Sequence, residues 1–72
     1  MRQYLIVIEK TKSGYSVFCP DLPGCVASGK SKAGALRSMR SAIDFHLDGM
    51  KEEGQRIPTP KSSSTYLEIK AA

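Results

Sequence analysis

The feature that most constrains the fold is one long stretch, residues 31–53, that no proline interrupts. Side chains suited to a buried face recur in it at alternating spacings of three and four, the period of an amphipathic helix; they are Leu36, Met39, Ile43, His46 and Met50. Ser31 suits the N-cap, and Gly54 suits a left-handed residue just past the end. The sequence therefore predicts one helix of about five or six turns.

Three short segments ahead of this helix favour strands. Residues 4–8 are a β-branched apolar run, residues 15–19 alternate in polarity, and residues 25–29 are small. A polar loop ending in Gly14 joins the first two, which predicts an antiparallel hairpin with a positive φ at that glycine. Small side chains on the third strand, and at Ala35, Ala42 and Gly49 in the helix, allow the two elements to pack closely.

The region after the helix predicts one further strand. Residues 57–60 hold two prolines and must be extended, residues 61–65 are a polar connector, and residues 66–69 favour a weak strand. The element order β-β-β-α-β predicts an α+β fold, an antiparallel three- to four-stranded sheet with one long helix. We expect a single domain over residues 1–72, with its core in 1–60, a connector and weak strand in 61–72, and no separate DNA-binding domain.

The size of the chain limits its stability. At 72 residues, it buries only about 60% of its unfolded surface, so its core is thin. Chains of this size commonly rely on a disulfide, a metal or a partner subunit. We expect self-association, because one helix covers only one face of the sheet and leaves the other face or an edge exposed.

A proline-rich turn joins the second and third strands; it consists of Pro20, Asp21, Leu22, Pro23, Gly24 and Cys25. The first proline cannot donate to a strand ladder, so the strand stops there. Residues 22–25 fit a type II turn. We expect the aspartate to bond nearby backbone N–H groups. Cys19 and Cys25 are interpreted as reduced, small apolar residues rather than a disulfide, a metal site or reactive thiols.

No residue pattern indicates catalysis. His46 lies in the middle of the apolar helix stripe, which favours a packed residue over a general base. Motifs for phosphate binding, metal ligation or a nucleophilic serine are absent from the sequence. We therefore expect no enzyme activity, no catalytic residues, no cofactor and no metal.

Charge is distributed unevenly along the helix, although the net charge is +4. Its start is basic, through Lys30, Lys32, Arg37 and Arg40, and its end is acidic, through Asp44, Asp48, Glu52 and Glu53. The basic residues are either an ordinary solvated face or a patch for anions or a partner. The N-terminal apolar run is too short for a signal peptide, so we expect a cytoplasmic protein without a membrane segment.

These motifs, in this order, resemble the HicB-like antitoxin family: residues 15–25, Gly29, Ser31 opening an Ala-rich helix, and then residues 53–60. The resemblance implies a partial ribonuclease-H-like fold without its catalytic carboxylates, assembled into dimers or tetramers. It also implies the antitoxin of a type II toxin–antitoxin pair, which masks HicA, a small basic toxin that cleaves mRNA. The turn at residues 20–25 is the family's signature.

Two classes of function follow for this chain. The first is a non-enzymatic antitoxin-like protein that binds a HicA-type toxin, with the acidic helix end facing the toxin. The alternative is a small basic nucleic-acid-binding protein that uses the basic helix start, or an orphan HicB-like homologue without a toxin. Nucleic-acid binding predicts a steep loss of affinity with salt, because each neutralised phosphate releases counterions.

Overall fold

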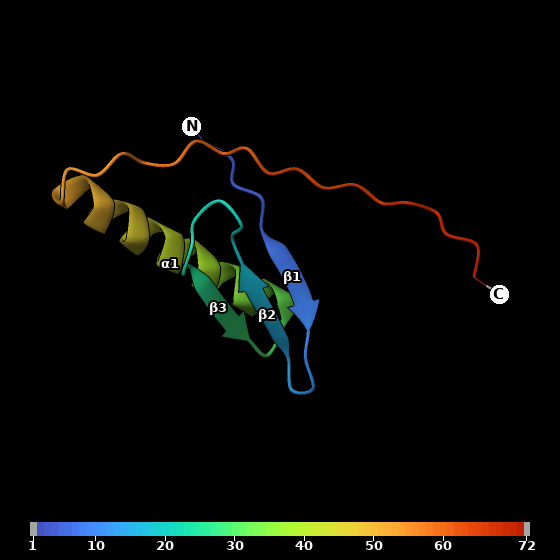
Figure 1. The fold of residues 1–72 in the computed structure, drawn as a ribbon. Coiled ribbons are helices and arrows are strands. Elements are labelled where there is room, and N and C mark those ends of the chain that lie inside the picture. Colours follow the sequence, from blue (N-terminus) through green and yellow to red (C-terminus); the bar gives the residue numbers. More distant parts are fainter. Residues whose placement is uncertain (1, 72) are drawn as a thin grey trace.

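The computed structural model describes residues 2–71 and shows a sheet with one helix across it (Figure 1). The elements follow in the order β1 (Val7–Lys10), β2 (Tyr15–Phe18), β3 (Val26–Gly29) and α1 (Lys32–Glu52). The sheet is antiparallel throughout, with strand order β1-β2-β3. The predicted α+β class is confirmed. No helix among residues 2–71 is long and apolar enough to cross a membrane.

The first strand begins later than the sequence predicts. Val7 pairs with Phe18, which is the last residue of β2, so residues 4–6 have no β2 residue opposite them. β2 stops there because Pro20 lacks an N–H and the chain turns away at Cys19. Residues 4–6 therefore continue the line of β1 past the end of its partner.

Gly14 corrects one prediction about the hairpin. Among the described residues, the glycines with a positive φ are Gly24 and Gly54, so the expected positive φ at Gly14 is wrong. The glycine is needed for a different reason. A Cβ atom at Gly14 would lie 2.3 Å from the carbonyl oxygen of Gly29, a distance that no real side chain tolerates. The close approach of two backbones, rather than turn geometry, selects glycine here.

The helix begins and ends where the sequence predicts. The Ser31 hydroxyl accepts a hydrogen bond from the Gly34 N–H at 3.0 Å, which is a standard N-cap. At the other end, Gly54 has a φ of +71°. The Gln55 N–H donates to the Met50 carbonyl at 2.8 Å and the Gly54 N–H to the Lys51 carbonyl at 3.0 Å, which together form a Schellman motif.

The core lies between α1 and the β2–β3 side of the sheet; its buried members are Val17, Cys19, Leu22, Cys25, Ala35 and Met39. Helix and sheet approach closely, because a Cβ atom at Gly29 would lie 2.6 Å from the backbone nitrogen of Ala35. Contacts of α1 fall mainly on β3 and then on β2. Helix side chains next to β1 are consequently less covered, and Leu36 remains 38% exposed.

The buried face of the helix differs in part from the predicted stripe. Ala42, Ile43 and Leu47 pack against the core, and Leu47 was not in the stripe. His46 is half-buried. Met39, Ile43, His46 and Met50 of the predicted stripe are buried or half-buried, and Leu36 at its start is the most exposed member.

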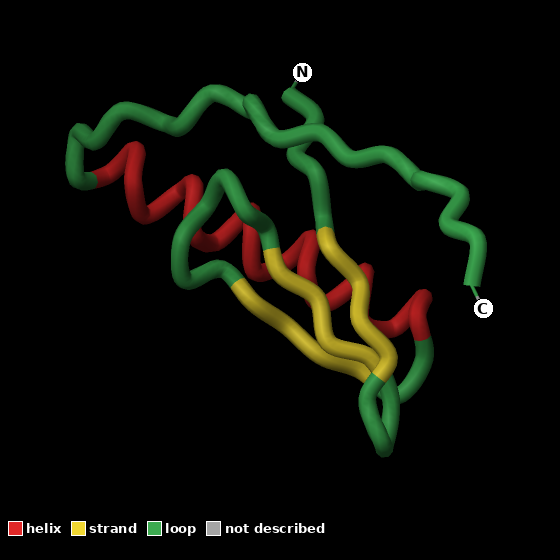
Figure 2. The backbone as a smooth tube through the Cα atoms, turned by 45° about the vertical axis from the view of Figure 1, so that its right-hand side comes forward, coloured by secondary structure: helices red, strands yellow, loops and turns green. Residues whose placement is uncertain are grey.

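The predicted final strand is not formed. Residues 66–69 lie in no strand, and they run extended away from the sheet and helix in both ribbon and tube views (Figures 1 and 2). Tyr66, Leu67 and Ile69 are 98%, 79% and 77% exposed. The prediction of a weak strand at residues 66–69 was wrong. We call residues 63–71 the tail.

Candidate partner-binding surfaces

The proline-rich turn consists of two tight turns in succession. The Leu22 N–H donates to the Cys19 carbonyl at 3.1 Å, and the Cys25 N–H donates to the Leu22 carbonyl at 3.1 Å. The second has Gly24 at a φ of +82°, as a type II turn requires, and confirms the prediction for residues 22–25. Leu22 is fully buried beneath the turn, which fixes the turn to the core.

Asp21 connects this turn to the C-terminal segment. One carboxylate oxygen accepts from the backbone N–H groups of Lys61 and Ser62, both at 3.0 Å, and the other accepts from the Ser62 hydroxyl at 2.7 Å. We call this arrangement the Asp21 clasp. The partners predicted from the sequence were nearby N–H groups, but the actual partners lie 40 and 41 residues away. The role is structural, as expected, but long-range.

The clasp depends on the charge of the carboxylate. Hydrogen bonds from the Ser62 N–H, the Lys61 N–H and the Ser62 hydroxyl, in that order, hold the pKa of Asp21 below its usual value. Partial burial opposes this effect without cancelling it. Hydrogen bonds to the ionised form favour that form, so the clasp is made by the carboxylate anion at neutral pH.

A second link joins the same returning segment to the N-terminal end of the chain. The Pro58 carbonyl accepts from the Arg2 guanidinium at 3.1 Å and from the Tyr4 hydroxyl. In Figure 1 the segment after α1 passes the N-terminal segment that leads into β1 before it continues into the tail. The two links hold residues 58–62 across the end of the sheet.

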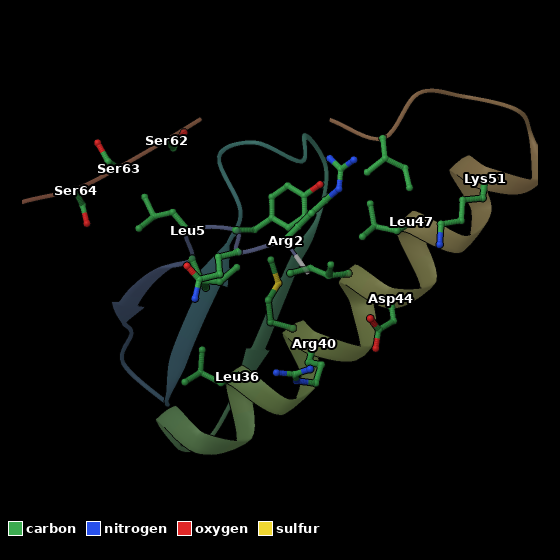
Figure 3. Close-up of a pocket in the computed structure, with 16 residues that line it drawn as sticks. Arg2, Leu5, Leu36, Arg40, Asp44, Leu47, Lys51, Ser62, Ser63 and Ser64 are labelled. Atoms are coloured by element: carbon green, nitrogen blue, oxygen red, sulfur yellow. The ribbon is translucent and has the colours of Figure 1, made fainter. Parts of the chain in front are cut away.

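An open groove of about 1030 Å³ lies between α1 and the N-terminal segment that leads into β1. We call it the β1 groove. Apolar side chains from both elements line it, including Leu5, Ile6, Leu36, Ile43 and Leu47 (Figure 3). Ser62, Ser63 and Ser64 also line it, so the tail leaves the domain beside the groove. No local sequence pattern indicates this groove, because its walls come from segments far apart in the chain.

Charged residues also line the groove. They are Arg2, Arg40, Asp44 and Lys51. Arg40 and Asp44 belong to the basic and acidic sets that the sequence singled out, and Figure 3 shows both on the helix side of the groove. The β1 groove is thus lined by one residue of the predicted basic set, Arg40, and one of the predicted acidic set, Asp44.

The other residues of the basic set lie elsewhere around the start of α1. Lys30 lines a small hollow of about 250 Å³ between the β1–β2 loop and the end of β3. Lys32 and Arg37 are exposed on the first turns of the helix. The anion or partner patch predicted from Lys30, Lys32, Arg37 and Arg40 stays a prediction.

The acidic end of α1 presents an exposed stripe. Asp44, Asp48 and Glu52 follow one another at intervals of one turn, and all three, like Glu53, are exposed. Phe45 stands beside this stripe and is 83% exposed. Phe45 was not among the residues predicted from the sequence; the signal that could have found it is an aromatic residue outside the apolar helical spacing. Aromatic side chains are enriched at protein–protein interfaces, so Phe45 is a candidate contact residue.

The two cysteines lie side by side at the base of the turn, where the Cys19 N–H donates to the Cys25 carbonyl at 3.3 Å. Both are buried and free, and that they are reduced and unreactive stays a prediction. Burial, and next the neighbouring Cys19, raise the pKa of the Cys25 thiol. Within residues 2–71, no group of three or more His, Cys, Asp or Glu residues is arranged to hold a metal ion.

Comparisons with known proteins agree with this fold and signature turn. A family model described as the HicB_like antitoxin of bacterial toxin-antitoxin system matches residues 4–70. The chain belongs to the HicB-like antitoxin family. The resemblance drawn from the signature turn and the helix flanks is thereby confirmed.

Relatives of this HicB-like chain include proteins of bacteria and phages. An uncharacterised 14.9 kDa protein from the rep-hol intergenic region of Haemophilus phage HP1 is 38% identical over 64 residues, which are 89% of this chain and 48% of that protein. Antitoxin HicB 2 of Photorhabdus laumondii is 27% identical over 71 residues, 97% of this chain and 51% of that protein. The chain thus spans about half the length of these two relatives.

A solved structure extends the comparison to an assembly. A chain of a structure titled HicA3 and HicB3 toxin-antitoxin complex is similar to this HicB-like chain with a TM-score of 0.70 and 30% sequence identity. The similarity covers 83% of this chain and 70% of that one. The fold described above is therefore one found in a toxin–antitoxin complex.

Proposed function

We propose that this chain is a non-enzymatic antitoxin of a type II toxin–antitoxin system, which binds and neutralises a small HicA-type toxin that cleaves mRNA. The observation that carries the proposal is the similarity, with a TM-score of 0.70 over 83% of the chain, to a member of a HicA3–HicB3 complex. Neutralisation requires only that the antitoxin cover a toxin surface, so it needs no catalytic group. The protein acts in the cytoplasm, where mRNA is cleaved.

The acidic end of α1 is the surface that suits such a toxin best. The family resemblance implies a basic toxin, and the stripe of Asp44, Asp48 and Glu52 offers it exposed carboxylates. Complementary charge speeds association and selects the partner. Phe45, exposed at the side of the stripe, offers an aromatic side chain of a type enriched at protein interfaces.

Binding to the product of the adjacent reading frame tests this proposal. The neighbour should be a small protein that arrests growth when expressed alone and is rescued by this chain. Phe45→Ala should weaken the complex at least about tenfold, because it removes the large aromatic side chain from the proposed contact surface. Asp48→Lys combined with Glu52→Lys should slow association, and more so at low salt.

Lys32→Glu is the matched control, because it changes an exposed charge at the other end of the same helix. It should leave toxin binding unchanged or slightly faster. A neighbour that is harmless alone and does not bind this chain would contradict the antitoxin proposal. If the toxin still binds the variants with acidic-end substitutions as tightly as the wild type, the antitoxin proposal stands, but the contact surface is not the acidic end of α1.

Nucleic-acid binding is the second candidate, supported by the exposure of Lys30, Lys32, Arg37 and Arg40 on a chain of net charge +4. It predicts affinity for RNA or DNA that falls steeply with salt. Replacing all four residues by glutamine should then abolish binding. Absence of RNA and DNA binding at low salt would eliminate this candidate.

A further inference from the structure

The two cysteines continue the ladder between β2 and β3. The register of that ladder ends with Phe18 opposite Val26. Cys19 and Cys25 therefore lie opposite each other one step further on, and the Cys19 N–H still donates to the Cys25 carbonyl at 3.3 Å. Opposed residues of a hydrogen-bonded antiparallel pair have Cα atoms about 5.5 Å apart, within the about 4.4–6.8 Å that a disulfide spans. The backbone thus places the two residues at a separation suited to a disulfide.

Both cysteine side chains lie on the helix-facing side of the sheet. Side chains alternate along a strand, so Cys19 lies on the same side as Val17, which is fully buried. Cys25 lies on the same side as Ala27, which packs against the core. Both cysteines belong to that one buried cluster and are only 3% and 5% exposed. The two thiols therefore face the same small volume at the base of the signature turn.

The turn between the cysteines holds them in this arrangement. The Leu22 N–H donates to the Cys19 carbonyl and the Cys25 N–H to the Leu22 carbonyl, both at 3.1 Å. Leu22 is fully buried, and Gly24 has the positive φ that the second of the two tight turns requires. A bond between the two sulfur atoms would therefore close a loop whose ends the fold has already brought together.

A metal ion suits this pair less well than a disulfide. Two sulfur ligands fall short of the four protein ligands that a structural zinc site takes. Asp21, the acidic residue that lies between the cysteines in sequence, already accepts hydrogen bonds on both carboxylate oxygens, from Lys61 and Ser62. Two adjacent thiols without further ligands can instead exchange with a disulfide.

We infer that Cys19 and Cys25 form an intramolecular disulfide when a small organic disulfide is present as oxidant, so that the signature turn carries a reversible redox site. The thiolate of one cysteine attacks the S–S bond of the oxidant, which gives a mixed disulfide and releases one small thiol. The second thiolate then attacks the protein sulfur of the mixed disulfide, which forms the Sγ–Sγ bond and releases the other small thiol. The cysteine pair loses two electrons and two protons, and the oxidant gains both.

The dithiol is the resting form of this site. A reducing cytoplasm keeps thiols reduced, and disulfides that form there are usually transient. Burial, followed by the neighbouring Cys19, raises the pKa of the Cys25 thiol, so its reactive thiolate is scarce while the turn stays closed. The predicted lack of reactivity applies to this closed form. The redox site needs no partner protein and is independent of toxin binding.

Equilibration of the full-length protein with mixtures of reduced and oxidised glutathione tests this inference. After acid quenching and alkylation, intact mass spectrometry should show a form that lacks two hydrogen atoms and takes up no alkylating group. At one glutathione mixture, the ratio of disulfide to dithiol should be at least about tenfold higher in the folded protein than in urea, because the fold holds the thiols together. By linkage, the disulfide should stabilise the fold in turn and raise its melting temperature by at least about 5 °C.

Cys19→Ala and Cys25→Ala are the matched controls, because each leaves a single thiol in the same surroundings. Circular dichroism should show that both variants are folded. Each should gain at most one glutathione, and neither should melt at a higher temperature after oxidation. For the wild type, a disulfide-to-dithiol ratio no higher when folded than in urea, mixed disulfides alone, or disulfides only between chains would each overturn the inference.

Discussion

Residues 58–62 and the tail that follows them are both extended, but they are held in opposite ways. The first segment is fixed by hydrogen bonds to Asp21, Arg2 and Tyr4, and its neighbour in space is the end of the sheet. The tail has apolar side chains that are almost wholly exposed. Directional polar bonds therefore fix the first segment, while the apolar side chains of the tail stay exposed to solvent.

The largest expected effect is on the free energy of unfolding, and it comes from replacing a leucine by alanine either beneath the signature turn or in the tail. Leu22→Ala, at a fully buried site beneath the signature turn, should lower the free energy of unfolding by about 2–5 kcal/mol. Leu67→Ala, in the tail, should change it by less than about 0.5 kcal/mol when measured on the monomer. Urea unfolding at several protein concentrations measures both. Equal losses for the two variants in the monomer would show that the tail packs on its own domain.

Removal of the clasp should have the next largest effect. Asp21→Asn replaces an anion that accepts three hydrogen bonds with a neutral group that is a weaker acceptor. We expect amide hydrogen exchange at Lys61 and Ser62 to become at least about tenfold faster, while the core amide of Val17 changes less. Unchanged exchange at Lys61 and Ser62 would mean that other contacts hold the segment.

Acid should produce the same change in the wild type. Because the pKa of Asp21 is lowered in the folded state, its contribution to stability is fully present above the unfolded pKa of about 3.9 and is lost as the pH falls through the lower, folded pKa. The amide signals of Lys61 and Ser62 should report this transition in an NMR titration below pH 4. Asp21→Asn is the control, and those signals should then lack the transition.

The smallest effect belongs to the hydroxyl of the clasp. Ser62→Ala removes the 2.7 Å bond to Asp21 but leaves both backbone N–H donors in place. Exchange at Lys61 should therefore rise less than in Asp21→Asn. The pKa of Asp21 should move up toward its usual value, because one hydrogen bond to the anion is lost. An effect as large as that of Asp21→Asn would indicate that the hydroxyl, rather than the backbone, holds the segment.

The parts of the structure that the sequence predicted well are those decided by neighbouring residues. Ser31 and Gly54 set the ends of α1 through contacts within one turn, and Pro23 with Gly24 set the type II turn. Their signals are local and strong. The family, too, followed from such local motifs together with their order along the chain.

The parts that the sequence did not predict depend on distant residues. The partners of Asp21 lie 40 and 41 residues away, so no local pattern indicates them. The walls of the β1 groove come from the chain's first residues, from α1 and from the serines before the tail. The strand expected at residues 66–69 failed for a related reason, because a strand needs an edge, and this chain does not bring its own β1 alongside the tail.

The Asp21 clasp and the second link, from Arg2 and Tyr4 to Pro58, join residues far apart in the chain, which affects the order in which contacts form during folding. Arg2 and Tyr4 bond to a residue 56 and 54 positions away, in a chain of 72 residues, and Asp21 closes a loop of similar scale. Closing long loops costs entropy that local hairpins and helices do not incur. The hairpin and α1 should therefore assemble early and the clasp late. Contacts that form after the transition state govern unfolding rates, so weakening the clasp should shorten the lifetime of the native state without slowing its formation.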